Sequence, residues 1–117
     1  MLKTYRGSCH CGKVAYQVEG EIQEAFSCNC SLCSRRGGLL WFAPRDHFKL
    51  LSGQDDLTTY TFNKHVIQHQ FCKHCGVQSF ALGQNQRGDK MAAINIRCLE
   101  GFEFDRVPVK HIDGRAF

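Results

Sequence analysis

The chain has 117 residues, of which 43% are hydrophobic and 22% are charged, and its formal net charge is +4. This length suits one domain with a single core, and the composition is ordinary for a globular protein. Its longest basic cluster is the pair Arg35–Arg36, so the charge excludes the extended basic surface of a nucleic-acid-binding protein. We therefore expect one domain over residues 1–117 and no nucleic-acid partner.

Targeting and membrane segments are also not expected. The first eight residues contain no apolar segment like that of a secretory signal peptide. No stretch approaches the roughly 18 apolar residues that a membrane span requires. We expect a cytoplasmic protein, and in a reducing cytosol clustered cysteines are more often metal ligands than disulfides. The alternative is a secreted domain in which the eight cysteines form four disulfides.

The hydrophobic pattern predicts a mainly β protein. Val14, Tyr16 and Val18 alternate with more polar residues, as in a half-buried strand. Short helical turns are expected next, after Cys30 and over residues 45–48. Later segments are rich in threonine, aromatic and branched residues, which favour strands. In chain order the predicted strands are residues 13–19, 57–62, 66–71, 77–82 and 91–96, with a hairpin tip at 64–65 and an exposed loop over 84–89.

Cysteine spacing is the strongest functional signal. Seven of the eight cysteines lie in three short groups: Cys9-His10-Cys11-Gly12, Cys28-Asn29-Cys30-Ser31-Leu32-Cys33 and Cys72-Lys73-His74-Cys75-Gly76. A disulfide needs Cα atoms about 4.4–6.8 Å apart with facing Cβ atoms, which near neighbours rarely achieve without strain. A tetrahedral zinc ion, with Zn–S distances of about 2.3 Å, accepts such pairs readily. The spacing therefore predicts a zinc protein.

The first and third groups share a glycine directly after the second cysteine, Gly12 and Gly76. Glycine tolerates positive φ, so the chain can turn sharply and offer backbone N–H groups to the sulfurs. Such turns usually come in pairs that supply four thiolates to one ion. This pattern predicts a closed, structural zinc site, here termed the four-cysteine cluster, made by Cys9, Cys11, Cys72 and Cys75.

The second group supplies three thiolates within six residues: Cys28, Cys30 and Cys33, here termed the three-cysteine cluster. With three protein ligands a zinc ion keeps an open position for water or substrate, which is typical of catalytic sites. Alternatively, a histidine or Cys98 completes the set and makes the site structural. An iron–sulfur cluster is a further alternative, although none of the groups has a typical iron–sulfur spacing. Two bound zinc ions would lower the net charge from +4 to about +1.

These motifs resemble those of the glutathione-dependent formaldehyde-activating enzymes and the related centromere protein V. The resemblance rests on residues 7–12, 28–33, 71–80, 94–99 and 113–114. It implies a β-tent of packed antiparallel sheets, held together by structural zinc in the four-cysteine cluster. It also implies a catalytic zinc on Cys28, Cys30 and Cys33, which makes two ions per chain.

The resemblance further implies a carbon–sulfur lyase related to S-(hydroxymethyl)glutathione synthase. Its substrates would be a small thiol of the glutathione class and formaldehyde or a similar aldehyde. A thiol that enters the open position of a three-thiolate zinc would be deprotonated at neutral pH, and the ion could instead polarise the aldehyde oxygen. The alternative is a non-catalytic, zinc-stabilised module that binds thiols or a protein partner.

Other residues are weaker candidates, and each has a structural alternative. Carboxylates of a glutathione-like ligand require guanidinium or N–H partners, for which the candidates are Arg35, Arg36 and Arg97. Trp41 and Phe42 are expected either to wall a pocket or to lie in the core. We expect side chains that do not contact metal at the remaining positions considered: Cys98 as a buried apolar residue, His10 and His74 pointing outward, and His69 as a core histidine.

Overall fold

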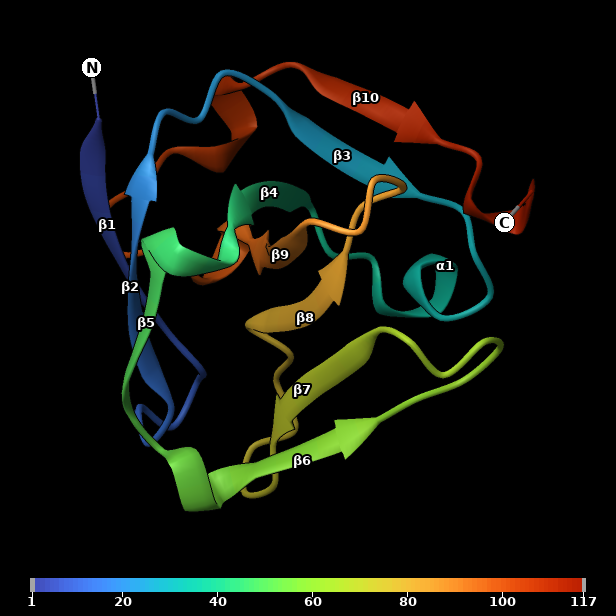
Figure 1. Ribbon diagram of the computed structural model, residues 1–117. Coiled ribbons are helices and arrows are strands. Elements are labelled where there is room, and N and C mark those ends of the chain that lie inside the picture. Colours follow the sequence, from blue (N-terminus) through green and yellow to red (C-terminus); the bar gives the residue numbers. More distant parts are fainter. Residues whose placement is uncertain (1, 117) are drawn as a thin grey trace.

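The computed structural model describes residues 2–116 and contains two β-sheets linked by short turns (Figure 1). The strands are β1 Lys3–Ser8, β2 Ala15–Gly20, β3 Ala25–Cys28, β4 Leu40–Pro44, β5 Phe48–Ser52, β6 Leu57–Tyr60, β7 Gln68–Cys72, β8 Phe80–Gln84, β9 Lys90–Asn95 and β10 Val109–Ile112. Within the described residues there is one α-helix, α1 Cys33–Arg36, and there are five 3-10 turns: η1 Arg45–His47, η2 Gln54–Asp56, η3 Ile96–Cys98, η4 Phe104–Arg106 and η5 Gly114–Ala116. None of these helical segments is long and apolar enough to cross a membrane.

The two sheets differ in size. The smaller sheet has the order β1-β2-β5, and the larger has the order β10-β3-β4-β9-β8-β7-β6. Neighbouring strands are antiparallel except β10, which runs parallel to β3 with Val109 opposite Ala25. The prediction of a mainly β fold made of antiparallel sheets is therefore confirmed. The parallel edge strand was not predicted, and it brings the C-terminal part of the chain beside β3 (Figure 1).

The five predicted strands correspond to β2, β6, β7, β8 and β9, although all their boundaries except the start of β6 differ from the predicted ones by one to three residues. β8 begins at Phe80 because Val77 still belongs to the preceding turn, where its carbonyl accepts the Cys72 N–H at 3.1 Å. β9 ends at Asn95, whose side chain accepts the Arg97 N–H at 3.2 Å and starts η3. Residues 97 and 98 consequently lie in a 3-10 turn and not on a strand.

The remaining local predictions agree with the structure. Helical turns follow Cys30 and Pro44, as α1 and η1. The tip between β6 and β7 contains Asn63 and His65, both with φ of 57°. The loop between β8 and β9 is closed by the Asn85 side chain, which accepts the N–H groups of Arg87 and Asp89.

Three aromatic rings form the contact between the sheets. Tyr16 on β2 and Phe48 on β5 both face Phe80 on β8, with ring centroids 5.6 Å and 4.7 Å away. Tyr16 is fully buried, and its hydroxyl donates to the Ser79 carbonyl at 3.2 Å. Gly7 leaves room for this ring, since a Cβ there would lie 2.5 Å from it. Tyr16 therefore links the small sheet to the large one through both packing and a hydrogen bond.

Replacing Tyr16 by Phe removes the hydroxyl, which is one of two donors to the Ser79 carbonyl; the other is the Asn95 N–H at 3.0 Å. Loss of such a hydrogen bond costs about 0.5–1.5 kcal/mol. We expect Tyr16→Phe to lower the free energy of unfolding by this amount in urea titrations followed by circular dichroism. The matched control is Tyr60→Phe at a residue that is 46% exposed, which should change it by less than about 0.5 kcal/mol. Equal effects of the two substitutions would contradict this role for Tyr16.

Candidate metal centres

The four-cysteine cluster joins segments from both sheets. Cys9 and Cys11 follow β1, whereas Cys72 ends β7 and Cys75 lies in the turn after it. The Cys11 sulfur lies 3.6 Å from the sulfurs of both Cys9 and Cys72, a residue 61 positions away, and all four sulfurs lie within 4.8 Å of one another. The corners of a tetrahedron with Zn–S distances of about 2.3 Å are about 3.8 Å apart. All eight cysteines are free thiols, so the cluster has the donor set and size for a tetrahedral zinc ion.

Backbone geometry explains the glycines of this cluster. Gly12 has φ of 84° and Gly76 has φ of 78°, in the region that favours glycine. A Cβ at either position would meet nothing within 4 Å, so the requirement is conformational and not one of space. The turns direct the Val14 N–H to the Cys9 sulfur and the His74 N–H to the Cys72 sulfur, each at 3.4 Å.

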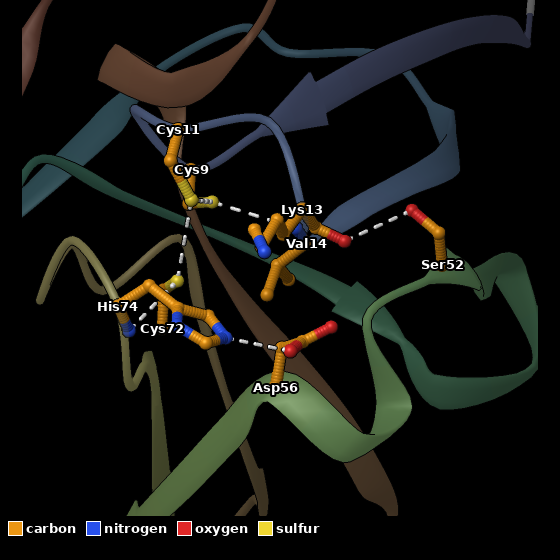
Figure 2. A network of polar contacts seen from close by, with 8 residues as sticks. All are labelled: Cys9, Cys11, Lys13, Val14, Ser52, Asp56, Cys72 and His74. Atoms are coloured by element: carbon orange, nitrogen blue, oxygen red, sulfur yellow. Dashed lines mark hydrogen bonds and ion pairs between the residues drawn. The ribbon is translucent and has the colours of Figure 1, made fainter.

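Neighbouring segments support the two turns from outside (Figure 2). The His74 ring points away from the sulfurs and contacts an oxygen of Asp56 at 2.7 Å. The hydrogen bond from His74 lowers the pKa of the Asp56 carboxyl. Ser52 donates to the Lys13 carbonyl at 3.1 Å. His10 is exposed, and neither His10 nor His74 belongs to a group that could hold a metal ion among the described residues.

The thiols of the four-cysteine cluster differ in their tendency to ionise. The N–H groups of Cys11 and Val77 donate to Cys75 and lower its pKa to about 6. At Cys11 the N–H of Lys13 also favours the thiolate, but desolvation and the sulfurs of Cys9, Cys72 and Cys75 raise its pKa to about 11. When no cation is present, each thiolate at this distance opposes the ionisation of its neighbours through charge repulsion. A divalent cation removes that conflict, because metal binding displaces the thiol protons.

The three-cysteine cluster lies between β3 and α1. Cys28 ends β3 and Cys33 begins α1, and their sulfurs lie within 4.8 Å of each other and of Cys30. The Cys30 N–H donates to Cys28 at 3.5 Å, and the Cys33 N–H donates to Cys30 at 3.4 Å. All three residues are partly buried, so the sulfurs are held together near the surface.

The three thiols differ in their tendency to ionise. Burial raises the pKa of both Cys28 and Cys33. Burial also opposes ionisation of Cys30, but hydrogen bonds from the Cys33 N–H and from the neighbouring thiols outweigh it and lower the pKa. Cys30 is therefore the member of the cluster that most readily provides a thiolate.

No histidine, cysteine, aspartate or glutamate within residues 2–116 joins these three sulfurs as a fourth ligand. The alternative in which Cys98 completes the set is not supported. Cys98 is partly buried in η3, and burial together with the nearby thiols of Cys9 and Cys75 raises its pKa to about 11. It therefore lies near the four-cysteine cluster, although it is not one of the four grouped sulfurs.

All three candidate arginines have local partners. Arg36 donates to the Gln78 side chain and lies 5.5 Å above the Phe71 ring, which connects the end of α1 to β7. Arg97 lies in η3 with its guanidinium 4.6 Å above the Phe104 ring. Arg35, which follows Cys33 in α1, is exposed and donates to the Ser31 carbonyl at 2.7 Å.

The core prediction for His69 is confirmed. Its side chain is 6% exposed and its Nδ1 lies 3.3 Å from the Gln78 amide nitrogen. Burial, together with the charge of Arg36, lowers the pKa of His69, which favours the neutral ring. With Gln78 as donor, Nδ1 accepts and the ring proton is on Nε2. Gln78 thus connects Arg36 to His69.

The aromatic pair that follows α1 divides between core and surface. Trp41 is buried and contacts Tyr5 with ring centroids 5.9 Å apart, whereas Phe42 is 38% exposed and packs against Phe26. Both border a hollow of about 240 Å³ whose other lining residues are Glu21, Gln23, Glu24 and Phe26. None of the three clustered cysteines lines this hollow, so it is separate from the candidate metal site.

Sequence reasoning missed the residues that surround the three-cysteine cluster from the C-terminal side. Asn29 donates to Asp113 at 2.9 Å and accepts the Arg115 N–H at 3.2 Å. Asp113–Gly114 and Asn29 lie within the motifs that resemble the family, but their contact joins residues more than 80 positions apart. Spacing within a short motif carries no information on such a contact.

Substitutions in the two clusters should have different consequences. We expect Cys75→Ser to lower the free energy of unfolding by more than about 3 kcal/mol, or to give insoluble protein, because it removes one of four sulfurs that would bind a single ion between the two sheets. Cys30→Ser should leave the fold intact and remove one of two metal equivalents. Metal analysis of purified protein and urea unfolding measure both effects. Equal losses of solubility would contradict the division into a structural and a second site.

Comparison with known proteins agrees with this arrangement. A crystal structure of a protein from Rhodobacter sphaeroides superposes with a TM-score of 0.78 and 31% sequence identity, covering 90% of this chain and 99% of the other. The family model described as glutathione-dependent formaldehyde-activating enzyme matches residues 4–112, which include both cysteine clusters. The chain therefore belongs to the family of glutathione-dependent formaldehyde-activating enzymes.

Proposed function

We propose that this protein is a zinc-dependent carbon–sulfur lyase that joins a small thiol of the glutathione class to formaldehyde or a similar aldehyde. Membership of the family supports a formaldehyde-activating, glutathione-related function. In this proposal the four-cysteine cluster holds structural zinc, and Cys28, Cys30 and Cys33 hold a second, catalytic zinc. Both sets consist of thiolates, which suit zinc.

The difference between the clusters carries the proposal. One cluster has four sulfurs that could enclose an ion, whereas the other has three and no fourth ligand among residues 2–116. Zinc held by Cys28, Cys30 and Cys33 would keep one position open and would favour the thiolate form of an incoming sulfur ligand. The partial exposure of all three cysteines supports access from solvent.

The reaction needs little from the protein beyond positioning. The sulfur lone pair of the thiol forms a bond to the carbonyl carbon, the C=O π pair moves to oxygen, and the thiol proton ends on that oxygen. Cys28 is fixed by β3, and Cys33 by α1, which Arg36 anchors to Gln78 and Phe71. Holding thiol and aldehyde together is worth several kcal/mol when their geometry is good. Since thiols add to formaldehyde unaided, this gain in free energy is sufficient for the rate enhancement that the reaction requires.

The rival function is a zinc-stabilised module that binds a thiol or a protein without turnover. It predicts the same metal content and the same fold. It differs in one measurement, the rate at which free glutathione and formaldehyde exchange with S-(hydroxymethyl)glutathione.

Exchange spectroscopy by NMR measures this rate at equilibrium. We expect the zinc-loaded protein to raise the exchange rate above the spontaneous value, and Cys30→Ser to return it to that value. The matched control is Cys98→Ser, since Cys98 belongs to neither group of sulfurs, and it should retain the full rate. A fully zinc-loaded wild-type protein that leaves the spontaneous rate unchanged would refute the proposed activity and support the binding module.

A further inference from the structure

The chain that follows β10 lies directly against the three-cysteine cluster. A Cβ at Gly114 would lie 2.4 Å from the Cys28 sulfur and 3.1 Å from the Cys30 Cβ. Real Cβ atoms do not approach other atoms this closely, so only glycine fits without movement. The backbone of Gly114 therefore forms one wall of the cluster.

Asn29, the residue between the first two cysteines, holds this wall in place. Its backbone N–H donates to the Ile112 carbonyl at 3.1 Å, and its side chain bonds to Asp113 and to the Arg115 N–H. Its carbonyl accepts from Arg115 Nε at 2.8 Å. These contacts attach three positions around Gly114, residues 112, 113 and 115, to one residue of the cysteine motif.

The same contacts place the Arg115 guanidinium at the edge of the cluster. Nε is its one bonded nitrogen, and both Nη groups lack a hydrogen-bond or ion-pair partner among residues 2–116. Arg36 is engaged by Gln78 and Phe71. An exposed guanidinium fixed through Nε still presents two parallel N–H groups, which match the two oxygens of a carboxylate.

The negative charge around the three-cysteine cluster favours a compensating cation. Three thiolates exceed the charge of a divalent cation by one, and the Asp113 carboxylate beside them adds a second negative charge. A thiol that carries carboxylates would be repelled from such a site unless a cation compensates. Arg115 is attached next to the cluster and supplies that cation.

We infer that Arg115 is the specificity-determining residue of the three-cysteine site and binds a carboxylate of an incoming acidic thiol. This inference rests on the proposed function, because it requires a thiol to approach the three sulfurs. It assigns to Arg115 the discrimination between thiols of the glutathione class, which bear carboxylates, and neutral thiols.

Substitution of Gly114 tests whether its backbone lies directly against the Cys28 sulfur. In Gly114→Ala the new Cβ displaces either the segment or the Cys28 sulfur, so we expect cobalt(II) affinity at the three-cysteine cluster to fall by about tenfold or more. Binding at the four-cysteine cluster should not change. The matched control is Gly38→Ala, where the nearest atoms lie 3.6 Å away in ordinary contact. Unchanged affinity in Gly114→Ala would contradict the close approach and, with it, the placement of Arg115.

The inference itself is tested with cobalt(II)-loaded protein titrated with glutathione and with glutathione diethyl ester, which has no free carboxylate. Thiol binding is followed through the sulfur-to-cobalt absorption band. We expect wild-type protein to prefer glutathione, and Arg115→Gln to weaken glutathione binding by about tenfold while ester binding is unchanged. Arg115→Lys should recover part of the preference. The control is Arg87→Gln in the exposed loop between β8 and β9, which should behave as wild type.

Each other outcome overturns the inference. Equal weakening of both thiols in Arg115→Gln would mean that Arg115 only holds the segment in place. An unchanged preference would mean that another group binds the carboxylate. If neither thiol alters the spectrum of wild-type protein, the proposed function fails and the inference fails with it. If the ester binds and glutathione has no advantage, only the inference fails.

Discussion

The gathering of four sulfurs from distant parts of the chain is the constraint on which this structure depends. Cys9 and Cys11 belong to the segment after β1 in the small sheet, and Cys72 and Cys75 to the end of β7 in the large one. The aromatic contact of Tyr16, Phe48 and Phe80 lies between the same two sheets. A core of this size has a modest apolar surface, so thiolate ligation of one ion would be a large additional contribution to folding.

The two clusters share one feature of their local backbone geometry and differ in the residues that surround them. In both, backbone N–H groups point at sulfurs. Around the four-cysteine cluster, Asp56 and Ser52 brace the turns, and the fourth sulfur completes the set. Around the three-cysteine cluster, the segment over residues 112–115 covers one side and supplies no fourth ligand. The number of sulfurs, and not the geometry of the turns, would therefore distinguish a closed metal site from an open one.

What the sequence predicted depended on short-range patterns. The grouping of the cysteines follows from spacing and from Gly12 and Gly76, and the strands with clear alternation, such as β2, were found. Short strands such as β3 and the exposed β10 offer too few residues for a period to be recognised. The end of β9 is set by a side-chain hydrogen bond of Asn95, which hydropathy does not report. The role of Asn29 depends on partners 84 and 86 positions away, and no local pattern contains them.

The parallel pairing of β10 with β3 has a consequence for the order of assembly. Cys28, Cys30 and Cys33 are synthesised more than 70 residues before the strand beside them and the glycine against Cys28. A nascent chain can assemble the four-cysteine cluster once Cys75 has emerged from the ribosome. The three-cysteine cluster acquires its second wall only after the segment through Arg115 has emerged as well, so ligand selection at this site would follow assembly of the four-cysteine cluster.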